Sequence, residues 1–156
     1  MIYPNLRGES VSDDVGLMIQ VRNADDVAQY VRLCTLRGAA LWGVDYPIET
    51  KALRYPLVVY IHSPWRNGPA EAGVQAYGTA TRVTSATAAT GPQTPDFVPV
   101  HLRSETHKTW FRFDQILNVS PSVPHTEFYD EKRVRLENVP ADRPVILGPP
   151  YPVKHH

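Results

Sequence analysis

The sequence predicts an α+β fold in which one main helix covers a small barrel of mixed or mainly antiparallel strands. Helical periodicity occurs in one segment, residues 23–38, whereas five to seven short segments have the apolar or alternating composition of strands. Because these strands do not alternate with helices, a parallel α/β sheet is disfavoured. The length of 156 residues, without an internal repeat or a linker, suits one domain over residues 1–156.

The N-terminal half is expected to run from a strand through a helix to a turn. A polar lead-in arm, residues 1–14, precedes an apolar run of strand length at 16–21. Asn23 offers the N-cap of a helix, and Gly38 offers its end. Between them, apolar side chains recur at the spacing of one helix face: Val27, Tyr30, Val31 and Cys34. The stretch GAALWGVDYP at 38–47 is interpreted as a glycine-bordered turn around a tryptophan.

The remainder of the chain has the pattern of strands joined by loops. Residues 57–63 and 73–83 are strand-like, and we expect them to pair antiparallel across a long loop. Residues 84–95, rich in Thr, Ala and Gly, are expected to form a loop. Further strands are expected at 97–103, 109–119, 133–139 and 144–147. The chain has 15 prolines, many of them in residues 121–152, so this tail is expected to lie extended over the barrel.

Composition narrows the class of protein. The 16 basic and 16 acidic residues cancel, which argues against a protein held on nucleic acid mainly by long-range charge. Cys34 is the single cysteine, so no intrachain disulfide forms and a reducing, cytoplasmic location is predicted. Its place on the apolar helix face indicates a buried hydrophobe rather than a nucleophile. No apolar run approaches the roughly 20 residues of a membrane span, and the N-terminus lacks the apolar stretch of a signal peptide.

Five stretches of the sequence, in this order, resemble a known family. They are GLMIQV, NADDVAQYVRL, LWGVDYP, LVVYIHS and AGVQAYGTATRV, and they fall within residues 16–83. Their order and spacing resemble the EVE domain of the PUA-like superfamily. The resemblance implies a PUA-like pseudo-barrel that binds a modified or flipped base in an aromatic pocket, without catalysis and without a cofactor. The partner that it implies is DNA or RNA carrying a modified base, and not a membrane.

A captured base needs aromatic surfaces to stack on and polar groups to read its edge. Trp42 is either a plug of the core or one wall of such a slot. The slot is favoured, because Tyr60 and His62 share one face of their strand and can oppose it. The candidate nucleobase-binding residues are Trp42, Gly43, Val44, Tyr60, His62, Ser63, Trp65, Tyr77 and Trp110. The candidate phosphate-binding residues are Arg66, Arg82, Arg103 and Arg112.

Two other functions remain open from the sequence. Sister PUA-like families include amidohydrolases that act on modified cytidine, and Glu105, Lys108 and Thr109 are close enough in sequence for such chemistry, although a polar turn is the simpler interpretation. The other is a protein-interaction module whose aromatic residues all belong to the core. Six histidines suggest a metal, but His101 and His107 have no paired Cys and no HExxH motif, so no metal site is predicted.

Overall fold

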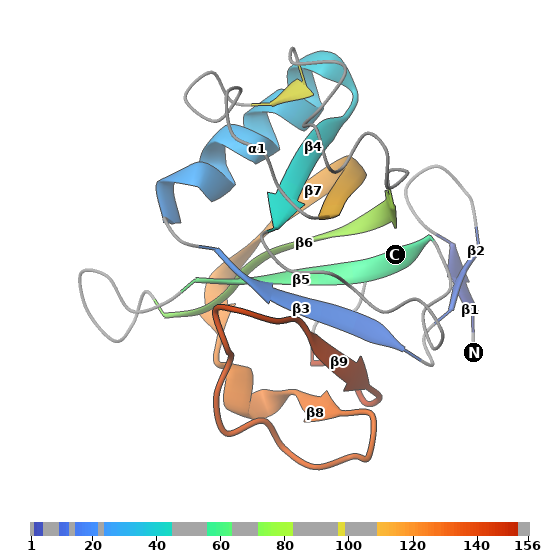
Figure 1. Ribbon diagram of the computed structural model, residues 1–156, viewed down its shortest axis with the longest axis vertical. Helices are drawn as coiled ribbons and strands as arrows, with labels where there is room; N and C mark the ends of the chain where they lie inside the picture. The colour runs from blue at the N-terminus through green and yellow to red at the C-terminus, as the bar shows by residue number, and fades with distance from the viewer. Residues whose placement is uncertain are drawn as a thin grey trace.

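A mixed sheet with a helix on one face forms the framework of the protein (Figure 1). The structure is a computed structural model, and it describes residues 2–4, 10–12, 15–21, 24–44, 56–63, 72–82, 97–98 and 109–152. In chain order the elements are β1 (Ile2–Pro4), β2 (Ser10–Ser12), β3 (Gly16–Gln20), α1 (Ala24–Arg37), β4 (Ala40–Val44), β5 (Leu57–Ser63), β6 (Gly73–Arg82), β7 (Thr109–Val123), the 3₁₀ turn η4 (His125–Glu127), β8 (Tyr129–Asp130) and β9 (Val145–Gly148). The α+β class that the sequence predicts is therefore confirmed.

Seven strands form the main sheet, in the order β4-β7-β6-β5-β3-β9-β8, and β1 pairs with β2 in a separate antiparallel ribbon. Within the main sheet β3 and β5 run parallel, and all other neighbours are antiparallel. The antiparallel pair expected from residues 57–63 and 73–83 is β5 with β6. β4 and β8 form the two edges of the sheet, so the described residues do not show the closed barrel that the sequence predicts.

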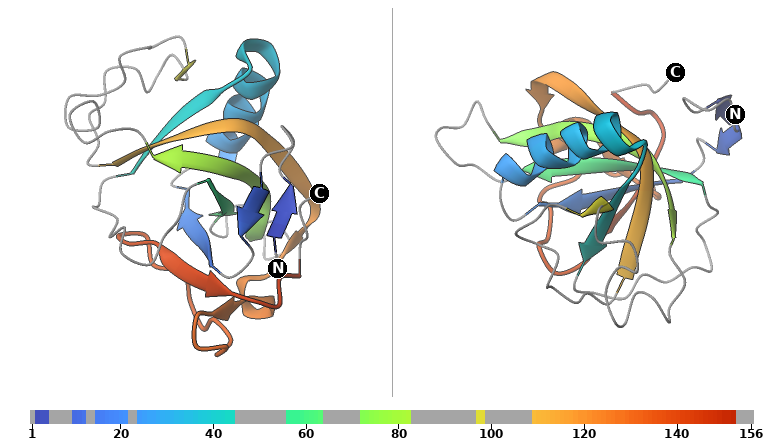
Figure 2. Two further views of the ribbon diagram at one scale, coloured as in Figure 1. Left: turned by 90° about the vertical axis from the view of Figure 1, so that its right-hand side faces the viewer. Right: turned by 90° about the horizontal axis from the view of Figure 1, so that it is seen from above.

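α1 lies over one face of the sheet, against β4 and β7 (Figure 2). Val27, Tyr30 and Cys34 are buried, as expected from their spacing on one helix face. Gly38 ends the helix with a φ of 80°, and its N–H donates a hydrogen bond to the Cys34 carbonyl oxygen at 2.9 Å. In the part of the chain that the structure describes, no helix is long and apolar enough to cross a bilayer.

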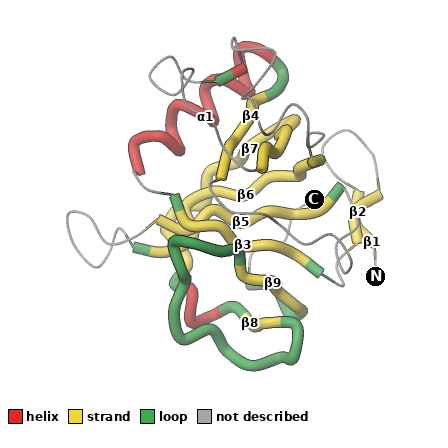
Figure 3. The backbone as a smooth tube through the Cα atoms, viewed as in Figure 1, coloured by secondary structure: helices red, strands yellow, loops and turns green. Residues whose placement is uncertain are grey.

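The sheet separates two apolar cores. The helix-side core lies between α1 and the sheet and includes Val59 of β5. The tail-side core lies on the opposite face, where residues 124–152 cover the sheet mostly as loops (Figures 1 and 3). It includes Val58 and Tyr60 of β5, together with Phe128 from the covering segment. Successive residues of β5 therefore enter different cores, which is the two-residue period of a strand buried on both faces.

The turn expected at residues 38–47 is wrong for residues 40–44, and residues 45–47 lie outside the described residues. Ala40–Val44 forms the strand β4, paired antiparallel with β7. Trp42 faces the helix-side core, while Leu41 packs into a separate small cluster on the other face. Because both faces of this segment are covered, its alternating apolar side chains favour an extended strand over a turn.

The strand expected at residues 133–139 is also wrong. Only Arg135 makes an isolated bridge there. Oδ1 of Asp130 accepts hydrogen bonds from the backbone N–H groups of Lys132 and Val134, at 2.8 and 3.0 Å. A short polar side chain that bonds its own backbone in this way curls the chain into a turn, so the alternating residues that follow do not form a strand.

The other strand predictions are mostly confirmed. The runs at 16–21 and 144–147 correspond to β3 and β9, and the run at 109–119 is β7, which is longer than predicted. Residues 97–98, expected to begin a strand, form a short turn. The rest of that predicted strand and the loop predicted at 84–95 lie outside the described residues.

Candidate functional site at the end of β5

A buried histidine lies at the C-terminal end of β5. His62 and Ser63 are 6% and 0% exposed, although both are polar. Gln20 of β3 is the register partner of His62 in the parallel pair of strands, and its Oε1 lies 3.2 Å from Nδ1 of His62. On the tail side, the ring of His125 in η4 meets the His62 ring edge to face, with 5.4 Å between the centroids. Three elements far apart in sequence thus contribute polar side chains to one place.

The charge state of His62 follows from this environment. The pKa of His62 is lowered to about 4. Burial is the larger cause, and the neighbouring His125 is the smaller one. The imidazole is therefore neutral near pH 7. A neutral imidazole carries one proton, and the contact with Oε1 of Gln20 places that proton on Nδ1.

Nε2 of His62 then presents a lone pair. This atom is buried and has no hydrogen-bond partner among the described residues. Most buried polar atoms in folded proteins are hydrogen-bonded, and leaving one unpaired costs about 1–3 kcal/mol. His125, on the η4 side of this atom's ring, is only half-buried. Nε2 of His62 is therefore a hydrogen-bond acceptor that a donor from a ligand could satisfy.

The sheet is irregular at this same end. Ile61 pairs with Ala76, but the next residue of β5, His62, pairs with Val74, so the register skips Gln75. The pairing of β6 with β7 is displaced at the same point of β6. Bulges re-aim side chains and are over-represented next to functional sites. This one sets the position of His62 relative to the rest of β5.

Gly73 is the first residue of β6 and lies next to this irregular pairing. It has a φ of 127°, which favours glycine, and a Cβ built on it would lie 2.7 Å from the carbonyl oxygen of Val123. The hydroxyl of Ser122 donates a hydrogen bond to the carbonyl oxygen of Ala72 at 3.0 Å, which ties the end of β7 to the start of β6. The backbone around the candidate site is therefore held by close contacts rather than by regular pairing.

Tyrosines line the sheet face next to His62. Tyr60 is fully buried and packs against Tyr77, Phe128 and Tyr151, with ring centroids 6.0, 5.1 and 5.8 Å away. Tyr77 is half-buried, and burial raises the pKa of its phenol. Tyr60 is thus a core residue, whereas Tyr77 offers part of a ring at the edge of that core.

Four of the nine candidate nucleobase-binding residues lie on the paired strands β5 and β6: Tyr60, His62, Ser63 and Tyr77. Of these, Tyr60 and Tyr77 stack on each other. Trp65 and Arg66 follow Ser63 after Pro64 but lie outside the described residues.

The slot expected between Trp42 and Tyr60 is absent, because the two rings enter different cores on opposite faces of the sheet. Trp42 is 5% exposed and stacks on Tyr30 with 4.0 Å between centroids and 19° between planes. Its ring also meets the edge of Phe113 at 6.1 Å. Of the two interpretations of Trp42 that the sequence leaves open, the structure favours the one in which its ring fills the core.

The neighbours of Trp42 do not form a base-reading turn either. Gly43 and Val44 belong to β4, in register with Trp110 and Thr109 of β7. Trp110 is 1% exposed, in the small cluster on the other face of that strand pair. These residues therefore serve the packing of β4 on β7.

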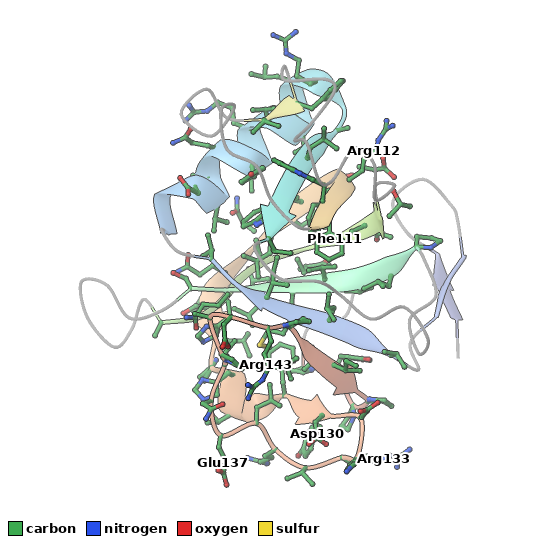
Figure 4. All side chains as sticks on the ribbon, viewed as in Figure 1. Phe111, Arg112, Asp130, Arg133, Glu137 and Arg143 are labelled. Carbon is green, nitrogen blue, oxygen red and sulfur yellow. The ribbon has the colours of Figure 1, made fainter. Side chains whose placement is uncertain are left out.

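Of the four candidate phosphate-binding arginines, the structure describes the side chain of Arg112 alone. Arg112 is half-exposed, with Nε 3.7 Å from a carboxylate oxygen of Asp114, and Figure 4 shows it above the central strands, whereas Arg143 of the tail lies below them. Arg82 ends β6, and nothing is described of its side chain; Arg66 and Arg103 lie outside the described residues.

Cys34 is a core residue, as its position on the helix face predicts. Its thiol lies 3.8 Å from the Phe113 carbonyl oxygen, and burial, the largest cause, raises its pKa to about 12. For the alternative amidohydrolase, Glu105 and Lys108 lie outside the described residues, and Thr109 is described only as the first residue of β7. Within the described ranges, no group of three His, Cys, Asp or Glu side chains could hold a metal ion.

One open groove of about 560 Å³ lies within the tail, between the turn after β8 and the start of β9. Charges of both signs line it, including Asp130, Glu137 and Arg143 (Figure 4). None of the candidate base-binding residues lines it. Glu137 connects this groove to the His62 site, because its carbonyl oxygen accepts a hydrogen bond from Nε2 of His125 at 3.0 Å.

Sequence reasoning missed Gln20 and His125. Gln20 is the one polar side chain in the run GLMIQV, which was a weak signal that this position meets another polar group. His125 stands in the proline-rich tail, where no pattern marked it. No family model, no curated protein and no solved structure matches this chain.

Proposed function

We propose that the protein is a non-enzymatic binding protein that receives a nucleobase, modified or flipped out of DNA or RNA, at the end of β5. The observation that carries this proposal is the buried Nε2 of His62, a hydrogen-bond acceptor without a partner among the described residues. A base brings both an N–H donor for this atom and a flat ring for the aromatic side chains beside it. The half-buried rings of Tyr77 and His125 are the partly accessible aromatic surfaces nearby.

The chain order supports the same proposal. A strand, a helix, a Trp-Gly-Val segment and two antiparallel strands follow one another as β3, α1, β4, β5 and β6. This is the order of the stretches that resemble the EVE domain of the PUA-like superfamily. We therefore propose a PUA-like arrangement with the binding residues relocated from Trp42 to His62.

The chemistry of His62 favours binding over catalysis. A general base works best when its pKa lies near the working pH. The imidazole of His62, with a pKa lowered to about 4 by burial and by His125, is a weak base near pH 7. It accepts a hydrogen bond without removing the proton, which is the role that base recognition needs.

The proposal is tested by titrating the folded protein with nucleosides and short oligonucleotides, with and without modified bases, while the ¹⁵N signals of His62 are followed by NMR. We expect the Nε2 signal to shift in a saturable way. The variant His62→Phe, which keeps a ring of similar size but no acceptor, should lose binding. Leu36→Ala is the matched control, because Leu36 is 74% exposed on the helix and should bind as the parent does.

A folded protein whose His62 signals do not respond to any base would overturn the proposal. So would a His62→Phe variant that binds with the affinity of the parent. A saturable response of the signals of Trp42 without one at His62 would return the site to the helix-side core.

A further inference from the structure

We infer that Gln20 determines which edge of a base the site accepts, by holding His62 in the tautomer whose Nε2 is an acceptor. At the position that faces Nε2, the site then selects an exocyclic amino group, as in adenine or cytosine, over a carbonyl oxygen. This inference rests on the proposed base binding and goes beyond it, because it assigns selectivity to a residue that need not touch the base.

Gln20 is placed firmly enough for this role. It is in register with His62 across the parallel β3–β5 pair, and β3 is held on its other side by β9. One residue further on, the N–H of Val21 donates to the carbonyl oxygen of His62 at 2.9 Å, which fixes the two backbones at the site. The amide oxygen of Gln20 therefore meets Nδ1 through a short and constrained connection, at 3.2 Å.

His125, the second neighbour of the His62 ring, does not bond to Nε2 of His62. Nε2 of His125 lies 3.0 Å from the carbonyl oxygen of Glu137, so this nitrogen carries the proton that it donates. Nε2 of His125 is thus engaged with Glu137, and the two histidine rings meet edge to face with 5.4 Å between their centroids. Among the described side chains, the contact with Gln20 is the one hydrogen bond that sets the tautomer of His62.

The selectivity follows from the pairing of donors and acceptors. An amino group facing Nε2 makes an N–H···N hydrogen bond, whereas a carbonyl oxygen in the same place faces a lone pair and leaves two acceptors unpaired. Sites built around one buried hydrogen bond discriminate strongly against analogues that lack it. We expect at least a tenfold preference for amino over oxo bases. A monomethylated amino group keeps one N–H and should be tolerated, whereas a dimethylated one has none and should bind as weakly as the oxo base.

The test compares matched bases in the parent and in two variants of Gln20. Dissociation constants are measured for adenosine and inosine, for cytidine and uridine, and for the N6-monomethyl and N6-dimethyl forms of adenosine. Gln20→Leu removes the acceptor that holds the proton on Nδ1, so the amino-to-oxo preference should fall toward one. Gln20→Glu keeps an acceptor in the same place and should retain the preference. The ¹⁵N shifts of the free proteins report the tautomer directly, and circular dichroism confirms that each variant is folded.

The outcomes separate this inference from the proposed function. If no base binds the parent protein, the proposed function itself is wrong. If bases bind but amino and oxo forms bind equally, the function stands and the selectivity inference is overturned. The inference is also overturned if the free parent protein carries its proton on Nε2, or if Gln20→Leu keeps both the tautomer and the preference.

Discussion

His62 makes the stability of the protein depend on pH in a window that can be calculated. In the unfolded chain its pKa is near the ordinary value of 6.5, and in the folded protein burial first, and His125 second, lowers it to about 4. The folded state therefore resists protonation, while the unfolded chain takes up the proton readily. The stability associated with neutral His62 is fully present above about pH 6.5 and is lost as the pH falls toward 4.

The size of the effect follows from the same two values. Each pKa unit of difference is worth about 1.4 kcal/mol, so between pH 7 and pH 5 the folded protein should lose about 2 kcal/mol through this one group, and about 3 kcal/mol by pH 4. Other groups titrate in the same range, so the effect has to be isolated by comparison with His62→Phe, which lacks the titrating ring.

The assay is urea unfolding of both proteins at a series of pH values, followed by circular dichroism. The difference in unfolding free energy between the two proteins should change by about 2 kcal/mol from pH 7 to pH 5, with the parent losing more. An NMR titration of the folded parent should place the midpoint of His62 near 4. In His125→Phe that midpoint should rise only part of the way to 6.5, because burial is the larger cause. Parallel stability curves, or a midpoint near 6.5 in the parent, would refute the buried, neutral state of His62 on which the site depends.

Three further changes test the packing. Trp42→Ala should lower the unfolding free energy in urea by about 3–5 kcal/mol, because Trp42 fills the helix-side core and stacks on Tyr30. Gly73→Ala should cost about 1–3 kcal/mol or more in the same assay, because the new Cβ combines a positive φ with a contact on the Val123 carbonyl oxygen. Cys34, with a pKa raised to about 12 from 9.0, should react with iodoacetamide about a thousandfold more slowly in the folded protein than a free cysteine does, as measured by mass spectrometry.

The two substitutions each have a control. Leu36→Ala removes an exposed side chain and should leave stability within about 0.5 kcal/mol of the parent, whereas a similarly small loss in Trp42→Ala would mean that Trp42 is not part of the core. Gly38→Ala has a positive φ but nothing within 4 Å of the new Cβ, so it should cost less than Gly73→Ala; the reverse order would contradict the close contact at Gly73. Rapid alkylation of Cys34 before unfolding would contradict its burial.

The helix and the longer strands were predictable because local patterns specify them. The helix spacing of Val27, Tyr30 and Cys34 and the apolar run of β5 were both legible in the sequence. The two-residue period also placed Val58 and Tyr60 correctly on one face of their strand. Local periodicity gives the two faces of a strand and the stripe of a helix, and for these segments it was sufficient.

The site was not predictable, because it depends on the order of strands. The alternation of side chains along a strand assigns Trp42 to one face of β4 and Tyr60 to one face of β5. It does not say which of those faces share a core. That depends on the order β4-β7-β6-β5-β3, in which the pairs β4–β7 and β5–β3 join strands that are distant in the sequence. The contact between Gln20 and His62 arises in the same way, from a parallel pair of strands with α1 and β4 between them in the chain.

The pairing of β9 with β3 has a consequence for how the protein is made. Residues 145–147 lie against residues 16–18, so one of the first strands of the main sheet receives its second neighbour only when almost the whole chain is available. Contacts of such long range slow folding, because a large loop must close before they form. On the ribosome, the face that carries Met18 and Tyr60 stays uncovered until the tail has emerged. The ring contact between His62 and His125 therefore forms only after η4 has been synthesised.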